Sequence, residues 1–278
     1  MTLRAVHAGR ANPFGGDLAV RVASAVVLAA FAFAGAWIGG WLAALVVAVA
    51  VVVVHLEWSS LTGDQREPAL LLTAGLVLAI AVATAGYPGL ALILVLVLIV
   101  AAGATSRSPW RPSGVAYAAV LGFGVLLVCL SPAFNRSATV FLLIVVWATD
   151  TGAFFAGRLI GGAKLWPSLS PNKTWAGAIG GLVAGVVGGA IVAEVAGLPV
   201  SLPLLAVAFS LALASEAGDL FESWVKRLFG AKDSGRLVPG HGGFMDRVDG
   251  LTAAAGLAAL IGWFHGGAGD IAGGLVSW

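Results

Sequence analysis

Residues 89–105 read GLALILVLVLIVAAGAT, an apolar run of 17 residues without a charged side chain. As a helix, such a run crosses most of the roughly 30 Å hydrocarbon layer of a membrane. Runs of similar length recur along the chain, and they are continuously apolar rather than alternating as the strands of a membrane barrel are. This pattern predicts an all-α, polytopic integral membrane protein.

The composition excludes a soluble globular protein. Hydrophobic residues make up 60% of the 278 residues and charged residues only 10%, whereas a soluble domain averages about 25% charged residues. The single cysteine, Cys129, lies inside an apolar run, so an intrachain disulfide is excluded. Arg4 and Arg10 precede the first run, and no small-residue cleavage site follows it, so we interpret that run as a membrane helix rather than a signal peptide.

The apolar runs predict about nine transmembrane helices. Their expected bounds are Ala19–Ile38, Trp41–Leu56, Ala69–Gly86, Gly89–Thr105, Gly114–Leu130, Ala138–Gly157, Ala176–Ala196, Ser201–Gly218 and Gly250–His265.

The distribution of basic residues tests this count, because loops on the cytoplasmic side of a membrane are enriched in Lys and Arg. With a cytoplasmic N-terminus and nine spans, the inner segments hold every Lys and Arg except Arg136. We therefore predict an N-terminus inside and a C-terminus outside. Two long inner loops, Arg158–Trp175 and Asp219–Asp249, then face the cytoplasm, and long polar loops between spans commonly carry function.

Polar residues divide the chain into two parts. Residues 1–137 carry five apolar spans, interpreted as packing helices that could also supply the contacts of a homodimer. Residues 138–278 are interpreted as the catalytic region, with the cytoplasmic loop 219–249. In the seventh span Gly177, Gly181, Gly185 and Gly189 recur every four residues, a stripe that allows close helix packing beside the site.

The loop after the eighth span carries the densest group of charges. Asp219, Glu222, Ser223 and Lys226 have the spacing i, i+3, i+4, i+7 and share one face of a helix that continues from that span. Asp246 and Asp249 have the spacing i, i+3 at the start of the ninth span. Neighbouring carboxylates repel each other unless a cation lies between them, and Mg²⁺ prefers such oxygen ligands.

Between these acidic groups lies the turn Pro239-Gly240-His241-Gly242-Gly243. Glycines permit positive φ and close backbone approach, and successive backbone N–H groups in such a turn can bind an anion. Metal carboxylates, a basic clamp and a flexible cradle are the parts of a metal-dependent phosphate-transfer site. The flanking basic residues are Lys226, Arg227, Lys232, Arg236 and Arg247.

Two further segments contain candidate site residues. Asp150 lies in the cytoplasmic half of the sixth span, where an ionisable side chain costs roughly 2.5–3.5 kcal/mol to insert and therefore usually faces a polar cavity. Lys173 lies in Ser170-Pro171-Asn172-Lys173-Thr174-Trp175, just before the seventh span. Glu57 and Glu194, at span ends, are interpreted as ordinary interfacial residues.

The signature that these residues form resembles that of the phosphatidate cytidylyltransferase (CDP-diacylglycerol synthase) family. It runs from Ser223 through Lys226-Arg227, Lys232-Asp233, Gly235 and Pro239 to His241-Gly242-Gly243-Phe244 and ends in Asp246-Arg247-Val248-Asp249. The segments Thr149–Arg158, Ser170–Gly177 and Gly218–Ser223 are similar to the family as well. One departure is Ala176, where the family usually has Glu.

The resemblance implies that CTP and phosphatidate react to give CDP-diacylglycerol and pyrophosphate, with Mg²⁺ required, at the inner membrane of a bacterium. No nucleic acid is involved. On this reading Asp219, Asp246 and Asp249 hold one or two cations, and Lys226, Arg227 and Arg247 clamp phosphates. His241, Gly242 and Gly243 would bind the nucleotide. Asp150, Lys173 and Ser223 would line the site of the lipid headgroup. Lys232 and Asp233, in the same signature, would also bind substrate.

Three other interpretations stay open. The same fold could act on another lipid phosphate, as in CDP-archaeol synthesis, or serve as a CTP-using lipid kinase. A transporter or channel would also place carboxylates inside the membrane, although it leaves the long signature loop unexplained. A non-catalytic membrane scaffold is the third. A CDP-alcohol phosphotransferase is excluded, because its motif Asp-Gly-x2-Ala-Arg does not occur.

Overall fold

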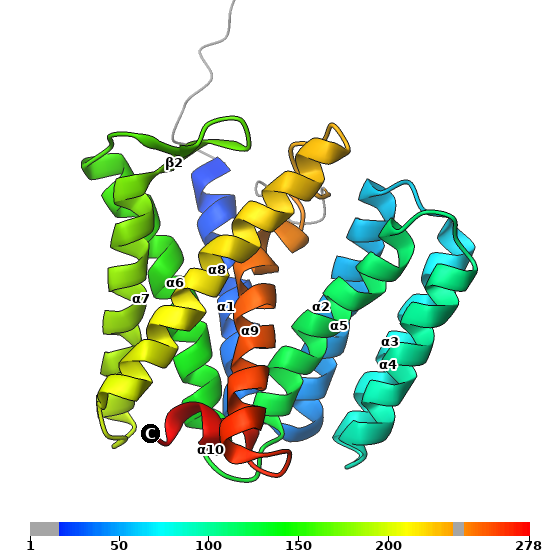
Figure 1. Cartoon of the computed structure of the whole chain (residues 1–278), viewed down its shortest axis with the longest axis horizontal. Helices are drawn as coiled ribbons and strands as arrows, with labels where there is room; N and C mark the ends of the chain where they lie inside the picture. Colours follow the sequence, from blue (N-terminus) through cyan, green and yellow to red (C-terminus); the bar gives the residue numbers. More distant parts are fainter. Residues whose placement is uncertain (1–16, 236–241) are drawn as a thin grey trace, which may run out of the picture.

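The computed structural model describes residues 17–235 and 242–278, which form a bundle of helices with one short hairpin (Figure 1). The helices are α1 (Asp17–Ile38), α2 (Gly40–Leu61), α3 (Arg66–Thr84), α4 (Pro88–Ala104), α5 (Trp110–Cys129), α6 (Asn135–Leu159), α7 (Trp175–Val195), α8 (Leu202–Leu228), α9 (Met245–Gly266) and α10 (Ile271–Val276).

Each apolar run predicted to be a span is helical. The largest difference in bounds is at α8, which continues ten residues past the expected Gly218 and so carries Asp219 and Lys226 on a helix, as their spacing predicts. Seven helices, α2, α3 and α5–α9, are long and apolar enough to cross a membrane. Within the described part of the chain α4 has 17 residues, and the apolar stretch Ala29–Ile38 is shorter still. The count of nine spans therefore stays a prediction.

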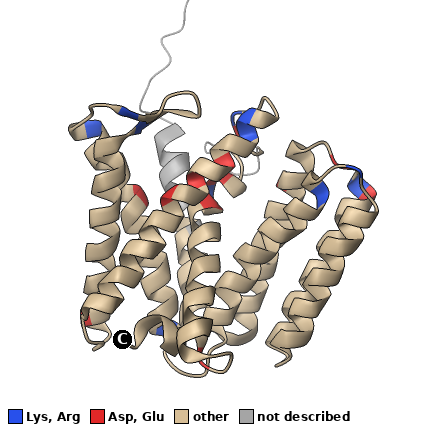
Figure 2. Cartoon of the chain, in the orientation of Figure 1, with Lys and Arg blue, Asp and Glu red and all other residues tan. Residues whose placement is uncertain are grey.

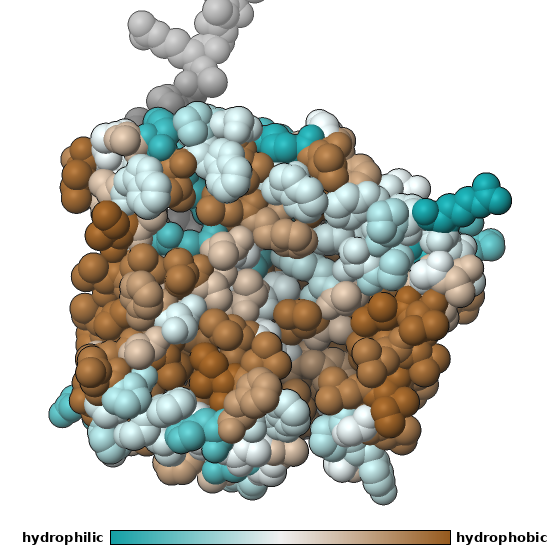
Figure 3. Space-filling model, viewed as in Figure 1, coloured by the Kyte–Doolittle hydropathy of each residue, from teal (hydrophilic) through white to brown (hydrophobic). Residues whose placement is uncertain are grey.

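The surface shows how the bundle meets a membrane. Apolar side chains cover the middle of the visible face, with polar side chains toward both ends (Figure 3). Most charged residues lie at one end, together with the hairpin and the end of α8, and few lie at the other (Figure 2). Together with the seven long apolar helices, this distribution identifies an all-α polytopic membrane protein.

Helix α9 joins two hydrophobic clusters. One cluster is built mainly by α2, α3, α4 and α5 and includes Met245 at the start of α9. The other is built by α6, α8, α9 and α10 and includes Ala254, Ala255 and Ala258 from the middle of α9. Because α9 contributes to both clusters, the two halves of the chain are packed around the helix that begins in the signature.

The glycine stripe of α7 packs against α6, as the sequence predicts. Gly177, Gly181, Gly185 and Gly189 are all buried. A Cβ added to Gly181 would lie 2.9 Å from the carbonyl oxygen of Thr149, and one added to Gly185 would collide with the Thr149 side chain. The absence of side chains therefore lets α7 approach the turn of α6 that precedes Asp150.

The hairpin of β1 (Lys164–Trp166) and β2 (Ser170–Thr174) is an element that the all-α expectation leaves out. The two strands pair antiparallel, with Lys164 opposite Thr174. Thr174 ends the hairpin and caps α7, because its side-chain oxygen accepts a hydrogen bond from the Gly177 N–H at 3.0 Å. The hairpin thus fixes Lys173 at the edge of the site.

Candidate active site

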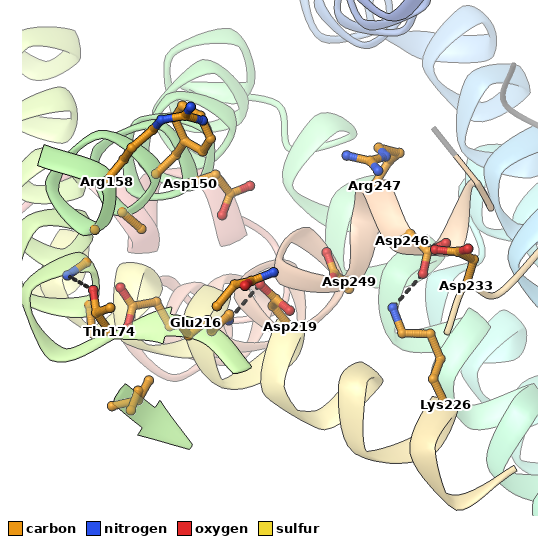
Figure 4. A pocket seen from close by; sticks show the side chains of 18 residues that line it. Asp150, Arg158, Thr174, Glu216, Asp219, Lys226, Asp233, Asp246, Arg247 and Asp249 are labelled. Atoms are coloured by element: carbon orange, nitrogen blue, oxygen red, sulfur yellow. Dashed lines mark hydrogen bonds and ion pairs between the residues drawn. The ribbon is translucent and has the colours of Figure 1, made fainter. Parts of the chain in front are cut away.

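A polar cavity of about 770 Å³ opens at the charged end of the bundle. Helices α6, α7, α8 and α9, the hairpin and the loop after α8 all contribute to its wall (Figure 4). Its volume is in the range of small-molecule sites. Its charged lining consists of the carboxylates Asp150, Glu216, Asp219, Asp233, Asp246 and Asp249 and the basic residues Arg158, Lys173, Lys226 and Arg247.

Helix α8 presents its charged face to this cavity. The carboxylate of Asp219 forms an ion pair with Lys173 of β2 at 2.6 Å, and these side chains are 37% and 25% exposed. The hydroxyl of Ser223, one turn further along, donates to Asp219 Oδ1 at 3.4 Å. Because α8 continues beyond the apolar span, its polar face meets the hairpin instead of lipid.

Lys226 lies between two carboxylates. Its ammonium is 2.7 Å from Glu222 Oε2 and 2.6 Å from Asp246 Oδ1. Glu222 is fully buried, whereas Lys226 retains an exposed fraction of 11% toward the cavity. One cation shared by two buried carboxylates leaves the group with an excess of negative charge, so removing Lys226 would leave both carboxylates unpaired.

Asp246 binds the loop between α8 and α9 on both sides of its undescribed part. Its carboxylate accepts hydrogen bonds from the backbone N–H groups of Ser234, at 3.1 Å, and of Gly243, at 2.9 Å. Gly242 has φ +88°, a conformation that favours glycine. The described end of the Gly-rich turn is therefore held by Asp246, and the Gly243 N–H is engaged inside the protein.

Three carboxylates from different helices share the inner cavity. Asp150 of α6, Asp219 of α8 and Asp249 of α9 lie close enough for their charges to interact, and Figure 4 shows all three beside the cavity. Asp249 Oδ1 also accepts a hydrogen bond from the Gly250 N–H at 2.8 Å. Mutual repulsion of this kind favours a bound cation or a bound basic group.

The donor set suits a cation that shares its ligands with a substrate. In residues 17–235 and 242–278 no three acidic, His or Cys side chains converge into a ready metal site. Mg²⁺ usually takes one or two protein carboxylates and completes its coordination with water and substrate phosphates. Asp249 and Asp219, which is paired with Lys173 but 37% exposed, are two such carboxylates, whereas the Asp246 carboxylate already holds Lys226 and the loop.

The predicted site residues separate into two groups. Those that line the cavity are Asp150, Lys173, Asp219, Lys226, Asp233, Asp246, Arg247 and Asp249. Those that do not are Ser223, Arg227, Lys232, Gly242 and Gly243. The Arg227 guanidinium donates to the carbonyl oxygen of Ala231 at 2.9 Å and is exposed. His241 lies outside the described residues, and the assigned roles of all these residues stay predictions.

Several cavity residues escaped the sequence reasoning. Glu216 precedes Asp219 by three positions on α8, so the helical spacing already used for Glu222 could have found it. Within the described chain its Oε1 atom is buried and has no hydrogen-bond partner. Arg158 lies in the last turn of α6, beside the cavity. Glu57, interpreted as interfacial, is instead buried against the signature loop.

Comparison with known proteins gives the family. A model described as the cytidylyltransferase family matches residues 19–265. The chain is 50% identical over 153 residues to a phosphatidate cytidylyltransferase of Brucella suis, covering 55% of this chain and 57% of the relative. It is 42% identical over 132 residues to one of Staphylococcus saprophyticus, covering 47% and 51%.

The matched stretches thus span only about half the length of these relatives. The family model, by contrast, extends over most of the present chain, from the first helix to the end of α9. The chain belongs to the cytidylyltransferase family.

Proposed function

We propose that this protein transfers the cytidylyl group of CTP to phosphatidate, giving CDP-diacylglycerol and pyrophosphate for phospholipid synthesis. The observation that carries the proposal is a cavity with both carboxylates and basic residues at one end of an apolar bundle. Such a cavity can receive a polar nucleotide from water and a lipid headgroup from the membrane. The names of the Brucella and Staphylococcus relatives support the same substrates.

Basic side chains would bind the phosphates of both substrates. Lys173 lies at the hairpin edge, Lys226 on α8 and Arg247 on α9, so they approach the cavity from three elements. Arg can hold a phosphate through two parallel hydrogen bonds, whereas Lys acts as a compact charge. Binding from several elements would align the two reactants before they react.

The reaction itself is a displacement at phosphorus. A phosphate oxygen of phosphatidate attacks the α-phosphorus of CTP and forms a new P–O bond. The bond from that phosphorus to the bridging oxygen of the β-phosphate breaks, and pyrophosphate leaves with the electron pair. The attacking oxygen is already anionic, so no general base is needed. The side chains would contribute alignment and charge neutralisation, which supply most of the rate in phosphoryl transfer.

We further propose Mg²⁺ as the cofactor, held by Asp219 and Asp249, with Asp150 and Glu216 available to a second cation. The cavity has six carboxylates against four basic residues, so two anionic substrates would be repelled from it without added positive charge. When bound, the cation would neutralise phosphate charge and stabilise the attacking and leaving oxygens.

For the membrane orientation we propose nine spans, with the N-terminus and the cavity on the cytoplasmic side of a bacterial plasma membrane and the C-terminus outside. Supporting this, the described basic residues gather at the cavity end, whereas Arg136 lies at the start of α6, against Trp37 near the end of α1. CTP is a cytoplasmic nucleotide, and the positive-inside rule favours the cytoplasmic side for this basic end.

The test is turnover by the purified protein in detergent, with phosphatidate, radiolabelled CTP and Mg²⁺. We expect label in the lipid phase that disappears with EDTA and returns when Mg²⁺ is added in excess. Lipid label that survives EDTA would contradict the cation proposal alone. A folded preparation that labels no phosphatidate, but labels another lipid phosphate, would contradict the proposed substrate. No labelled lipid with any acceptor would favour the transporter interpretation.

A further inference from the structure

Glu57 of α2 is bound to the signature loop from the other half of the chain. Its Oε1 accepts a hydrogen bond from the Phe244 N–H at 2.9 Å. Its Oε2 accepts from the Met245 N–H at 2.7 Å and from the Ser234 hydroxyl at 3.0 Å. Glu57 is 9% exposed, and it stands 187 positions before Phe244 in the sequence. It does not line the cavity.

These hydrogen bonds cap α9, the helix that carries Asp246 and Asp249. The first N–H groups of a helix have no partner within it, and a side chain near the N-cap usually accepts from them. Phe244 is the N-cap of α9 and supplies no such side chain. Glu57 accepts from Phe244 and from Met245, the first residue of α9, so it takes the place of a local cap. Its negative charge also suits the positive end of the helix dipole.

The glycines of the loop make room for this carboxylate. A Cβ added to Gly235 would lie 2.6 Å from Glu57 Oε1, and one added to Gly243 would lie 2.8 Å from Glu57 Oε2. Real Cβ atoms do not approach oxygen so closely without displacing it. Gly235 and Gly243 therefore contact the Glu57 carboxylate at positions where a larger residue would displace it.

The three hydrogen bonds of Glu57 to Ser234, Phe244 and Met245, here called the clamp, lie next to residues of the cavity. Met245 is followed directly by Asp246 and Arg247, and Asp249 lies one helical turn further on. Ser234, held by Glu57 through its hydroxyl, donates its backbone N–H to Asp246. Any shift at the Glu57 carboxylate would consequently move the start of α9 and the Asp246 side chain together.

We propose that Glu57 is a positioning residue for the transfer reaction: it acts through α9 and Ser234 to hold Asp246, Arg247 and Asp249 in register with the cavity. The expected effect on the reaction rate rests on the proposed function. The contacts of Glu57 themselves rest on the structure alone. The proposal assigns to the N-terminal half an indirect part in the reaction, through the start of α9. A displacement of about 1 Å among reacting groups can lower a rate on the order of 100-fold.

The experiment compares Glu57→Gln and Glu57→Ala with wild type. Gln keeps the shape and one acceptor oxygen, but its other terminal atom is an N–H₂ donor. That donor would face the N–H and O–H groups that now donate to Glu57. We expect kcat to fall on the order of 10- to 100-fold, in the order wild type, Gln, Ala, while KM for CTP changes less than kcat. Glu67→Gln is the matched control, because Glu67 is an exposed glutamate at the start of α3.

Hydrogen exchange provides a readout that does not need activity. In Glu57→Gln the amides of residues 242–249 should exchange faster than in wild type, and in Glu67→Gln they should not. Unchanged kcat and unchanged exchange in a folded Glu57→Gln protein would overturn the proposal. So would a stability loss without a change in the kcat of the folded fraction.

Ser234→Ala is the second variant, for the case that Glu57 variants do not fold. It removes one of the three donors to Glu57 and keeps the backbone N–H that binds Asp246. We expect a smaller loss of kcat and faster exchange over 242–249, and wild-type values for both would overturn the proposal. If wild type itself makes no CDP-diacylglycerol, the proposed function fails, while exchange still decides whether the clamp exists.

Discussion

The two halves of the molecule use ion pairs in different ways. In the N-terminal half Arg111 of α5 forms an ion pair with Asp64 at 2.6 Å, with exposed fractions of 7% and 10%. The same guanidinium donates to the carbonyl oxygen of Thr105 at 2.8 Å. In the C-terminal half Lys173 and Asp219 are paired at an equal distance but are open to the cavity.

The two regions differ in whether positive and negative charges are matched. Arg111 and Asp64 match one cation to one carboxylate and line no part of the active-site cavity. Around the cavity, carboxylates outnumber basic residues, and Lys226 alone is shared by Glu222 and Asp246. An ion pair that is closed to solvent and matched in charge can only support the fold. A group of carboxylates that is open to the cavity and exceeds its basic partners can still bind a ligand. The following variants test this distinction, from the largest expected effect to the smallest.

Asp219→Asn and Asp249→Asn should have the largest effect, on catalysis. Each keeps the side-chain shape and removes one charge from the acidic group in the cavity. We expect turnover to fall about 10²- to 10³-fold, the usual cost of losing one electrostatic contact to a transition state. The unfolding midpoint in SDS should not fall, because like-charge repulsion is relieved. Glu194→Gln, an exposed carboxylate at the far end of α7, is the control. Near-normal turnover in both variants would remove Asp219 and Asp249 from the mechanism.

Arg111→Met should reduce stability instead. It leaves the Asp64 side chain, which is 10% exposed, without its cation, and we expect a loss of about 1–3 kcal/mol, less than for a fully buried pair. SDS unfolding followed by tryptophan fluorescence should show the loss, while kcat per folded molecule stays at the wild-type value. Adding Asp64→Leu to the same chain should restore most of the stability. A fall in kcat at unchanged stability would show that the N-terminal pair serves the site.

Lys173→Ala should have the smallest overall effect, with a loss of stability below about 1 kcal/mol, because ion pairs that are open to solvent contribute little. Its effect should fall on binding: KM for CTP or phosphatidate rises, because a basic side chain is lost from the cavity edge. Arg66→Ala, an exposed basic residue at the start of α3, is the control. Wild-type KM values for both substrates would place Lys173 outside the binding site.

Local patterns in the sequence predict most of the fold. Continuous apolar runs predicted α1–α9, and the i, i+3, i+4, i+7 spacing predicted that α8 continues to Lys226. The spacing of glycines in α7 predicted its close contact with α6. These signals work because each depends on the geometry of one helix. The predicted residues that line the cavity were found through the same spacing and through the family resemblance.

The clamp formed by Glu57 could not be predicted in this way. No periodic signal connects Glu57 to Ser234, Phe244 and Met245, because their contact depends on how α2 packs against the start of α9. A glutamate at the end of an apolar helix has the same local sequence whether it meets headgroups or a buried N-terminus. The hairpin β1–β2 escaped for a related reason, since its short strands are recognisable only once they pair.

The most direct test of the account is the fate of two labels in one reaction. Purified protein, phosphatidate and Mg²⁺ are incubated with CTP labelled at the α-phosphate or, in a parallel sample, at the γ-phosphate. Cytidylyl transfer predicts that the α-label enters the lipid phase and the γ-label leaves as pyrophosphate, and that both are about 10²- to 10³-fold slower in Asp249→Asn. Lipid carrying the γ-label instead would identify a CTP-using lipid kinase and contradict the proposed reaction.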